Sequence, residues 1–174
     1  MENKLINRVA KSGLLTINLE EFYPKSELCS FDLKDYLFHG LILKEKEFRQ
    51  ALKDHDWSIY TDKHVFIHCS SDAIIPTWAY MLVASGLYQI ANSIYQGTEK
   101  EFLNHYYCQV LKNIDYSQYE GKKIVIKGCS NKPVPIGAYV ALTNHLKLHA
   151  LSIMYGEPCS TVPIYKKSRL LKKE

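Results

Sequence analysis

A segment with the features of a strand, a cysteine loop and a helix occurs twice in this sequence, and it constrains the fold more than any other feature. Each copy has a β-branched stretch, then Cys-Ser, then a proline where a helix would begin. These residues are, in order, Val65, Cys69, Ser70 and Pro76 in the first copy and Val125, Cys129, Ser130 and Pro135 in the second. Proline suits the first turn of a helix, because its missing N–H has no helical partner there. The pattern predicts an internally duplicated strand–Cys loop–helix–strand unit.

The two copies align over about 63–97 and 122–156. Upstream of the proline, adding 60 to each number pairs Cys69 with Cys129, and from Pro76 onward the offset becomes 59. The second loop is therefore expected to be one residue shorter than the first. Eight positions from Pro76 to Gly97 are identical to their counterparts, whereas roughly one or two would match by chance. We therefore expect an internal duplication.

Strands alternate with helices along the chain, which predicts an α/β fold with a largely parallel sheet and right-handed crossovers. Alternating apolar residues predict a strand at 15–19. Amphipathic spacing predicts a helix at about 44–55, a capping box begins another at about 98–113, and a short helix is expected at about 30–40.

No linker interrupts this pattern. We expect a single α/β domain over residues 1–165, followed by a basic tail at 166–174. The tail is interpreted as a solvated terminus rather than a nucleic-acid contact. A chain of 174 residues, 47% hydrophobic and 23% charged, is long and apolar enough to form a real core.

Composition also indicates the compartment. The first twelve residues mix charged and apolar side chains and lack an apolar signal core, so we expect a cytoplasmic protein. The uncharged stretch at 73–98 contains Pro76, Gly86 and Gln89, which favours a buried helix and strand over a membrane span. We expect neither a membrane nor a nucleic acid as partner, and the sequence leaves the oligomeric state open.

Five cysteines, at positions 29, 69, 108, 129 and 159, are the candidate chemical groups. An odd count without a signal peptide argues against a disulfide framework and favours metal or thiol chemistry. The Cys-Ser loop occurs a third time, in shortened form, at Cys159-Ser160. Cys29 and Cys108 lie outside these loops and are interpreted as small buried hydrophobes.

The three loop cysteines are expected to share one site. The carboxyl ends of parallel strands meet at one edge of a sheet, which would bring Cys69, Cys129 and Cys159 together. Nearby helix N-termini favour the thiolate form. Asp72 is in the first loop and can reach the same place, whereas His68 is expected on the opposite face. The predicted site has three thiolates and one open or carboxylate position, for zinc, iron or an iron–sulfur cluster.

Two other functions remain open at this point. The chain could be a thiol-dependent enzyme or sulfur carrier, with one reactive cysteine beside Asp72 or His68. It could also be an interaction scaffold whose cysteines are inert. The sequence has no CxxC pair, and its cysteine spacings match no standard zinc motif. These residues do not identify a reaction.

The cysteine loops at 69–80, 128–135 and 155–165, with the segments 7–13 and 40–46, resemble an uncharacterised bacterial family. This is family 2480 of the domains of unknown function, found mainly in Bacteroidota. The likeness covers nearly the whole chain, and the three cysteines fit it. The family has no assigned activity, but its genes often neighbour iron–sulfur cluster assembly genes. The resemblance therefore implies a context and nothing about mechanism. In that context, we expect first a role as an accessory in iron–sulfur cluster assembly or transfer, with assembly proteins as partners.

Overall fold

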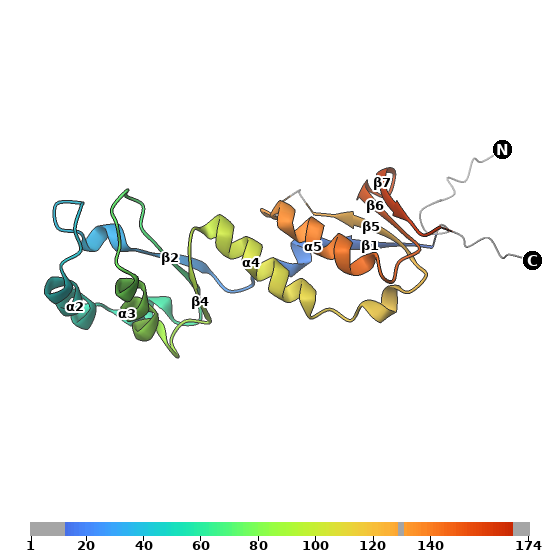
Figure 1. Cartoon of the computed structure of the whole chain (residues 1–174). Helices are drawn as coiled ribbons and strands as arrows, with labels where there is room; N and C mark the ends of the chain where they lie inside the picture. The colour runs from blue at the N-terminus through green and yellow to red at the C-terminus, as the bar shows by residue number, and fades with distance from the viewer. Residues whose placement is uncertain (1–12, 129–130, 169–174) are drawn as a thin grey trace, which may run out of the picture. The chain divides into compact units, whose positions relative to one another are not determined.

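The computed structural model describes residues 13–128 and 131–168 (Figure 1). The chain forms two compact units. The central unit is Pro24–Leu103, and the terminal unit combines the chain up to Tyr23 with the chain from Asn104 onward. The predicted α/β class is confirmed, and every strand pair is parallel except the last one, β6 with β7. The predicted single sheet is wrong, because the strands form two sheets.

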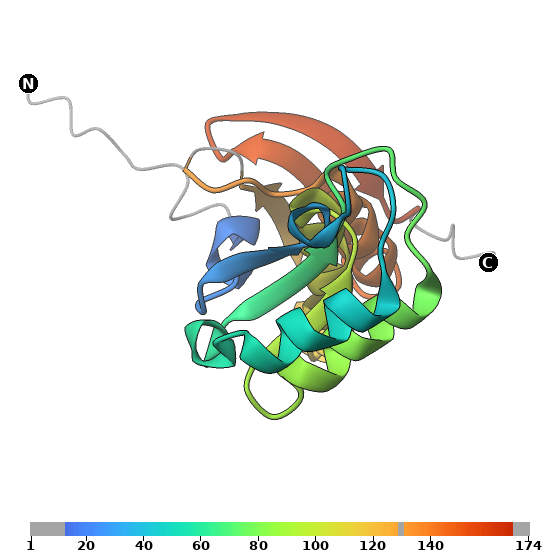
Figure 2. The same cartoon turned by 90° about the vertical axis from the view of Figure 1, so that its left-hand side faces the viewer.

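The central unit contains a three-stranded sheet in the order β2-β3-β4. Its elements, including the 3-10 helices η2 and η3, are β2 (Leu28–Asp32), η2 (Leu33–Tyr36), α2 (Glu45–Asp54), η3 (Trp57–Tyr60), β3 (His64–His68), α3 (Thr77–Leu87) and β4 (Ser93–Gln96). Helices α2 and α3 lie side by side against one face of this sheet (Figure 2). The core there is made by Phe31, Val65 and Ile67 from the strands, with Phe48 and Val83 from the helices.

The terminal unit contains a four-stranded sheet in the order β1-β5-β6-β7. Its elements are β1 (Leu14–Asn18), η1 (Leu19–Phe22), α4 (Glu99–Lys112), η4 (Tyr116–Tyr119), β5 (Lys123–Lys127), α5 (Ile136–Leu146), β6 (Ser152–Glu157) and β7 (Ser160–Lys166), with the first residues of α4 in the central unit. Ile124 and Ile126 of β5 pack against Tyr107 of α4 and Leu142 of α5. The sheet is therefore buried mainly on its helix-covered face.

The helices expected at 44–55 and 98–113 are confirmed as α2 and α4. The capping box at the start of α4 is also present, since the Thr98 amide donates to Glu101 Oε2 over 2.8 Å. The short helix expected at 30–40 is wrong. Its first part is strand β2, and Asp32 then caps the 3-10 helix η2 by accepting a hydrogen bond from the Lys34 amide.

The two units have the same order of elements from the first long helix onward. Each residue number in the terminal unit exceeds the number of its counterpart in the central unit by 59. The strand pair His64–Ser93 of the central unit, for example, corresponds to the pair Lys123–Ser152 of the terminal unit. The buried helix positions obey the same offset: they are Ala79, Val83 and Leu87 in α3, and Ala138, Leu142 and Leu146 in α5. The first strands, β1 and β2, also correspond, and each is followed by a 3-10 helix.

This offset corrects the alignment drawn from the sequence. Because it is 59 in the strands as well as the helices, Cys69 corresponds to Gly128, and Cys129 is one position further on. Matching the shared Cys-Ser pair shifts the alignment of the two strands by one residue. A shift of this size assigns every side chain to the opposite face of the sheet. Accordingly, Val65 and its true counterpart Ile124 both lie in helix-facing cores.

The segment expected to be a third cysteine loop, at Cys159-Ser160, does not connect a strand to a helix. Residues 160–166 form strand β7, and Pro158 and Cys159 make the turn between β6 and β7. Of the predicted basic tail, Lys166 ends β7, and residues 169–174 lie outside the described residues. The predicted domain extent, 1–165, stays a prediction.

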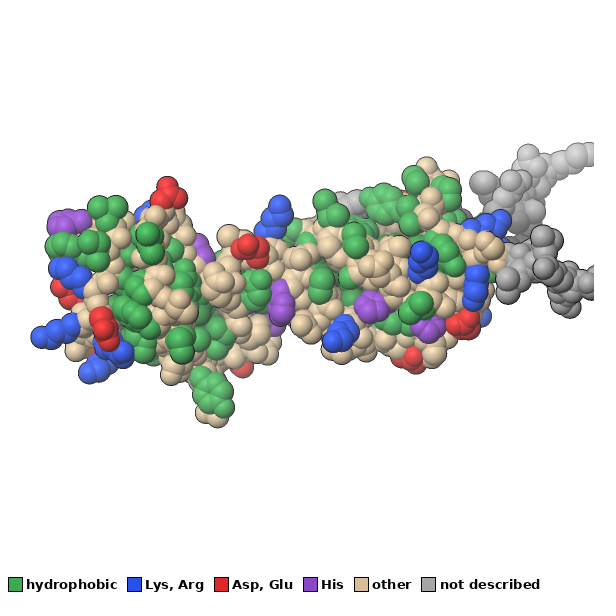
Figure 3. Space-filling model, in the orientation of Figure 1, with side chains coloured by type: hydrophobic (Ala, Val, Ile, Leu, Met, Phe, Trp, Pro, Cys, Tyr) green, Lys and Arg blue, Asp and Glu red, His purple; other side chains and the backbone are tan. Residues whose placement is uncertain are grey.

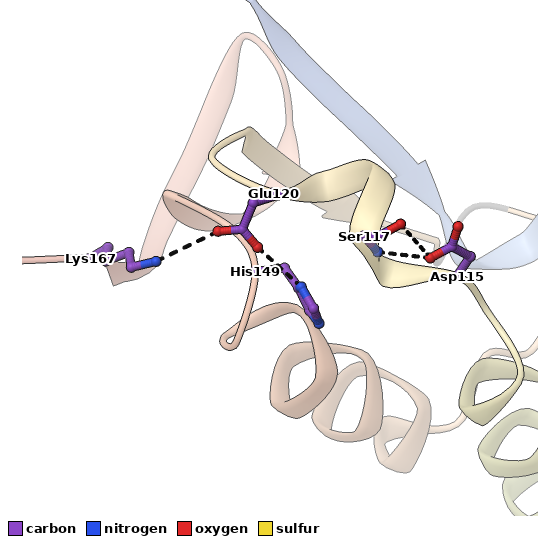
Figure 4. A network of polar contacts seen from close by, with 5 residues as sticks. All are labelled: Asp115, Ser117, Glu120, His149 and Lys167. Carbon is purple, nitrogen blue, oxygen red and sulfur yellow. Dashed lines mark hydrogen bonds and ion pairs between the residues drawn. The ribbon is translucent and has the colours of Figure 1, made fainter.

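A network of hydrogen bonds and ion pairs lies at the edge of the terminal sheet where its parallel strands begin (Figure 4). Glu120 accepts a contact of 3.2 Å from His149 Nδ1 and forms a 3.8 Å ion pair with Lys167, just after β7. Next to it, Asp115 caps η4 by accepting from the Ser117 amide and hydroxyl at 2.9 and 2.7 Å. These contacts connect η4, the end of α5 and the end of β7.

The uncharged stretch at 73–98 holds α3 and β4, as a buried helix and strand would require. Within residues 13–128 and 131–168, no helix is both long and apolar enough to cross a membrane.

Candidate functional site

Cys69 directly follows β3, at the carboxyl end of the central sheet. Its side chain is half-buried and packs against the core beneath α2 and α3. Its sulfur lies 3.3 Å from the hydroxyl oxygen of Ser71 in the same loop. The phenol of Tyr80 is nearby, and its pKa is raised by burial and by the negative charge that Cys69 would carry as a thiolate. The thiol is therefore placed between a hydroxyl group and the core.

Asp32, at the end of the neighbouring strand β2, anchors the Cys69 loop. Its Oδ1 accepts hydrogen bonds of 3.0 Å from the amides of Ser70 and Lys34. Partial burial acts to raise the pKa of Asp32, but the hydrogen bonds from Ser70 and Lys34 and the nearby His68 outweigh it, so the pKa is lowered. The carboxylate is therefore held in its charged form at the base of the loop.

The two proposed neighbours of Cys69 differ in their placement. The His68 ring lies beside Phe66, with ring centroids 5.8 Å apart, on the face away from the core that Cys69 contacts. The expectation that His68 points to the opposite face is confirmed, so these two adjacent residues do not form a Cys–His pair. Asp72 is in the loop after Cys69 and is exposed to solvent.

The corresponding loop of the terminal unit begins at Gly128. This residue has φ of +142°, and an added Cβ would lie 2.9 Å from Leu19 Cβ, so only glycine fits. The Tyr139 hydroxyl donates to the Gly128 carbonyl, and the Asn131 amide donates to Glu20 Oε1 over 3.0 Å. Cys129 and Ser130 themselves lie outside the described residues. An acidic side chain thus anchors the loop in this unit, as Asp32 does in the central unit.

Cys159 is exposed in the turn between β6 and β7. Strands β5 and β6 are parallel neighbours, and their carboxyl ends are joined by an ion pair of 3.3 Å between Lys127 and Glu157. The chain segments that carry Cys129 and Cys159 therefore start from the same edge of the terminal sheet.

The shared three-cysteine site stays a prediction, because Cys69 belongs to one unit and Cys159 to the other, and Cys129 is outside the described residues. Among the residues that are described, no three His, Cys, Asp or Glu side chains are grouped as metal ligands. Cys29, on β2, and Cys108, on α4, are both half-buried free thiols.

Sequence reasoning missed the acidic anchors Asp32 and Glu20. A signal for the first was present, since Asp32 precedes Leu33 much as Asn18 precedes Leu19, and both polar residues cap 3-10 helices. Asp and Asn at the end of a strand favour such local caps. The signal was hidden because the strand β2 itself was not predicted.

Fold and site together define an α/β protein with two mainly parallel sheets, in which Cys69 and Cys159 each follow the carboxyl end of a strand. The chain belongs to the family described as "Protein of unknown function (DUF2480)", whose model matches residues 3–167. Comparisons with curated proteins and with solved structures gave no match.

Proposed function

We propose that this chain binds zinc, iron or an iron–sulfur cluster through the thiolates of Cys69, Cys129 and Cys159, with Asp72 as a further ligand. In this role it would be an accessory in iron–sulfur cluster assembly, with assembly proteins as its partners. The observation that carries the proposal is the position of these cysteines, each within two residues of the carboxyl end of a parallel strand. Ligands bind at such strand ends in open α/β sheets.

The chemistry of the side chains supports a metal of this class. Thiolates are soft ligands that suit zinc and iron–sulfur clusters. Cys69 and Cys159 are free thiols, and the loop of Cys69 is fixed by hydrogen bonds to Asp32. A fixed loop loses little entropy when its thiolate binds an ion.

A second function is favoured by the contact between Cys69 Sγ and Ser71 Oγ at 3.3 Å. A hydroxyl at this distance can donate a hydrogen bond to a thiolate, which favours the charged, nucleophilic form. Cys69 would then be the reactive cysteine of a thiol-dependent enzyme or a sulfur carrier.

Cobalt(II) titration of the metal-free chain separates these functions. Cobalt bound by thiolates absorbs in the near ultraviolet, and the intensity increases with the number of thiolates. We expect a saturable signal that decreases when Cys69, Cys129 or Cys159 is replaced by serine and is unchanged in Cys29→Ser. If the signal is absent and iodoacetamide modifies Cys69 much faster than the other cysteines, the thiol function replaces metal binding. If the cobalt signal is absent and all five cysteines react equally slowly with iodoacetamide, the remaining function is that of an interaction scaffold.

We further infer that the two units arose by internal duplication. The constant offset of 59 in strand register and buried helix positions supports this inference. An alignment of family members should show the two units matching at this offset without a gap in the cysteine loops. A better match at an offset of 60 in the strands would contradict it.

A further inference from the structure

A groove of about 600 Å³ opens on the terminal unit between α5 and the sheet. Aliphatic and aromatic side chains make up most of its lining, contributed by Ile126, Val134, Ile136, Val140, Tyr155 and Ile164. Several of these are strongly exposed for apolar residues: Ile136 is 82% exposed and Ile164 is 51% exposed. Figure 3 shows apolar side chains reaching the surface over α5 and over β6 and β7.

The groove exists because of the one strand that the central unit lacks. Strand β7 extends the terminal sheet beyond β6, and Ile164 of β7 lines the groove opposite α5. In the central unit the sheet ends at β4, which corresponds to β6. Two of the apolar groove positions are polar there: Ile136 corresponds to Thr77, and Tyr155 corresponds to Gln96. One side of the groove is thus formed by a strand that the central unit does not have.

Lys147 supplies a positive charge at the end of α5, about one turn beyond the groove residue Asn144. Ile136, Val140 and Asn144 of α5 line the groove at helical spacing, and Lys147 continues this stripe at the end of the helix. The Lys147 ammonium lies 5.7 Å from the centre of the Tyr165 ring on β7. It pairs with no carboxylate in the described part of the chain. The ammonium is therefore available to an anion.

We propose that this groove binds a small apolar carboxylic acid, with the hydrocarbon part between α5 and β7 and the carboxylate beside Lys147. The volume supports a small molecule, since ligand pockets measure roughly 300–1,000 Å³ and are lined mainly by apolar side chains. The unpaired ammonium at one end supports an acid, because charge complementarity selects an anionic end group. The groove shares Val134 with the second cysteine loop, but the proposal does not depend on metal binding.

Titration of the ¹⁵N-labelled full chain with decanoate, below its critical micelle concentration, tests the proposal. We expect saturable shifts of the amide signals of α5 and β7. Decanol should bind about two- to fivefold more weakly, as expected for loss of one exposed ion pair. Decyltrimethylammonium, with the opposite charge, should bind more weakly still.

Matched variants locate the site. Val140→Glu places a carboxylate in the groove and should abolish decanoate binding, whereas Met81→Glu, at the corresponding position of α3, should not. Ile164→Thr should weaken binding from the β7 side and serves as a second variant if Val140→Glu fails to fold. Lys147→Gln should weaken decanoate about two- to fivefold without affecting decanol, and Lys112→Gln on α4 should change neither.

Three outcomes would overturn the proposal. The first is an absence of saturable binding by the wild-type chain. The second is equal binding by wild type and by folded groove variants. The third is a wild-type dimer that Val140→Glu dissociates and decanoate does not affect, because the groove would then be an interface between two copies of the chain.

Discussion

Trp57 and Tyr116 make the same hydrogen bond in the two units, although they are different residues. Trp57 Nε1 donates to the Leu52 carbonyl over 3.1 Å, and the Tyr116 hydroxyl donates to the Leu111 carbonyl over 2.7 Å. In each case the donor begins a 3-10 helix and the acceptor lies near the end of the preceding α-helix. The contact fixes how the chain turns from helix into strand, and it occurs in both units although the donor residues differ.

Tyr116→Phe should therefore destabilise the chain. The buried Leu111 carbonyl would lose its side-chain donor, and a hydrogen bond of this kind contributes about 0.5–1.5 kcal/mol. Urea denaturation measures the change in the free energy of unfolding. Tyr119→Phe is the matched control, since no hydrogen bond of its hydroxyl is found among the described residues, and it should change stability by less. Equal effects of the two substitutions would show that the Tyr116 hydroxyl is unimportant.

Gly128→Ala tests the start of the second cysteine loop. Its positive φ of +142° and the contact of 2.9 Å between an added Cβ and Leu19 Cβ should together cost about 3 kcal/mol. Gly121→Ala is the control, because it also has a positive φ, +66°, but nothing lies within 4 Å of the added Cβ. This second change should cost only about 1 kcal/mol. Similar losses in the two variants would exclude a steric role of Leu19.

His64 should make stability depend on pH. His64 is 6% exposed as a residue, and its Nδ1 lies 2.7 Å from the Ser93 hydroxyl. Burial lowers the pKa of His64 in the folded chain below the value of about 6.5 expected when unfolded. The unfolded chain then binds more protons, so the free energy of unfolding should fall as pH drops below about 6.5. His64→Gln should have a shallower pH dependence than wild type or the exposed-site variant His39→Gln; an unchanged slope would contradict this.

Local elements could be predicted from the sequence, because their signals are local. The helix α4 follows from its capping box at Thr98 and Glu101, and α3 and α5 follow from their prolines and apolar spacing. The choice of sheet partners could not be predicted in this way. It depended on β2, whose pairing of Cys29 with Val65 brings together residues far apart in sequence. Without β2, the second sheet could not be recognised.

The candidate site was predicted only in part, because strand pairing and register depend on residues that are far apart in the sequence. Cys69 follows a strand end as expected, but the match between Cys69 and Cys129 rested on identical residues, and the strand register places Gly128 at that position. Cys159 was expected in a loop and lies in a hairpin turn, because the β-branched residues after it pair with β6. The groove beside β7 was not predicted, since only tertiary structure brings Ile164 near α5.

If the chain binds a metal as proposed, removal of that metal should leave the chain folded. Each unit has its own cluster of buried apolar side chains, so we expect the chain to fold without an ion. By contrast, small domains that depend on structural zinc unfold when it is removed. Melting curves of loaded and chelator-treated protein should both show a cooperative transition, with only a modest decrease in Tm after chelation. Loss of the transition would mark the metal as structural and contradict a role in transfer.

Metal content of protein purified without oxygen tests the central claim most directly. The account predicts stoichiometric zinc or iron, or the colour of an iron–sulfur cluster, in the wild-type chain. Cys69→Ser, Cys129→Ser and Cys159→Ser should each lose it, because two thiolates are a poor chelate, whereas Cys29→Ser and Cys108→Ser should retain it. A wild-type chain without metal, or metal that survives all three of the first substitutions, would contradict the account.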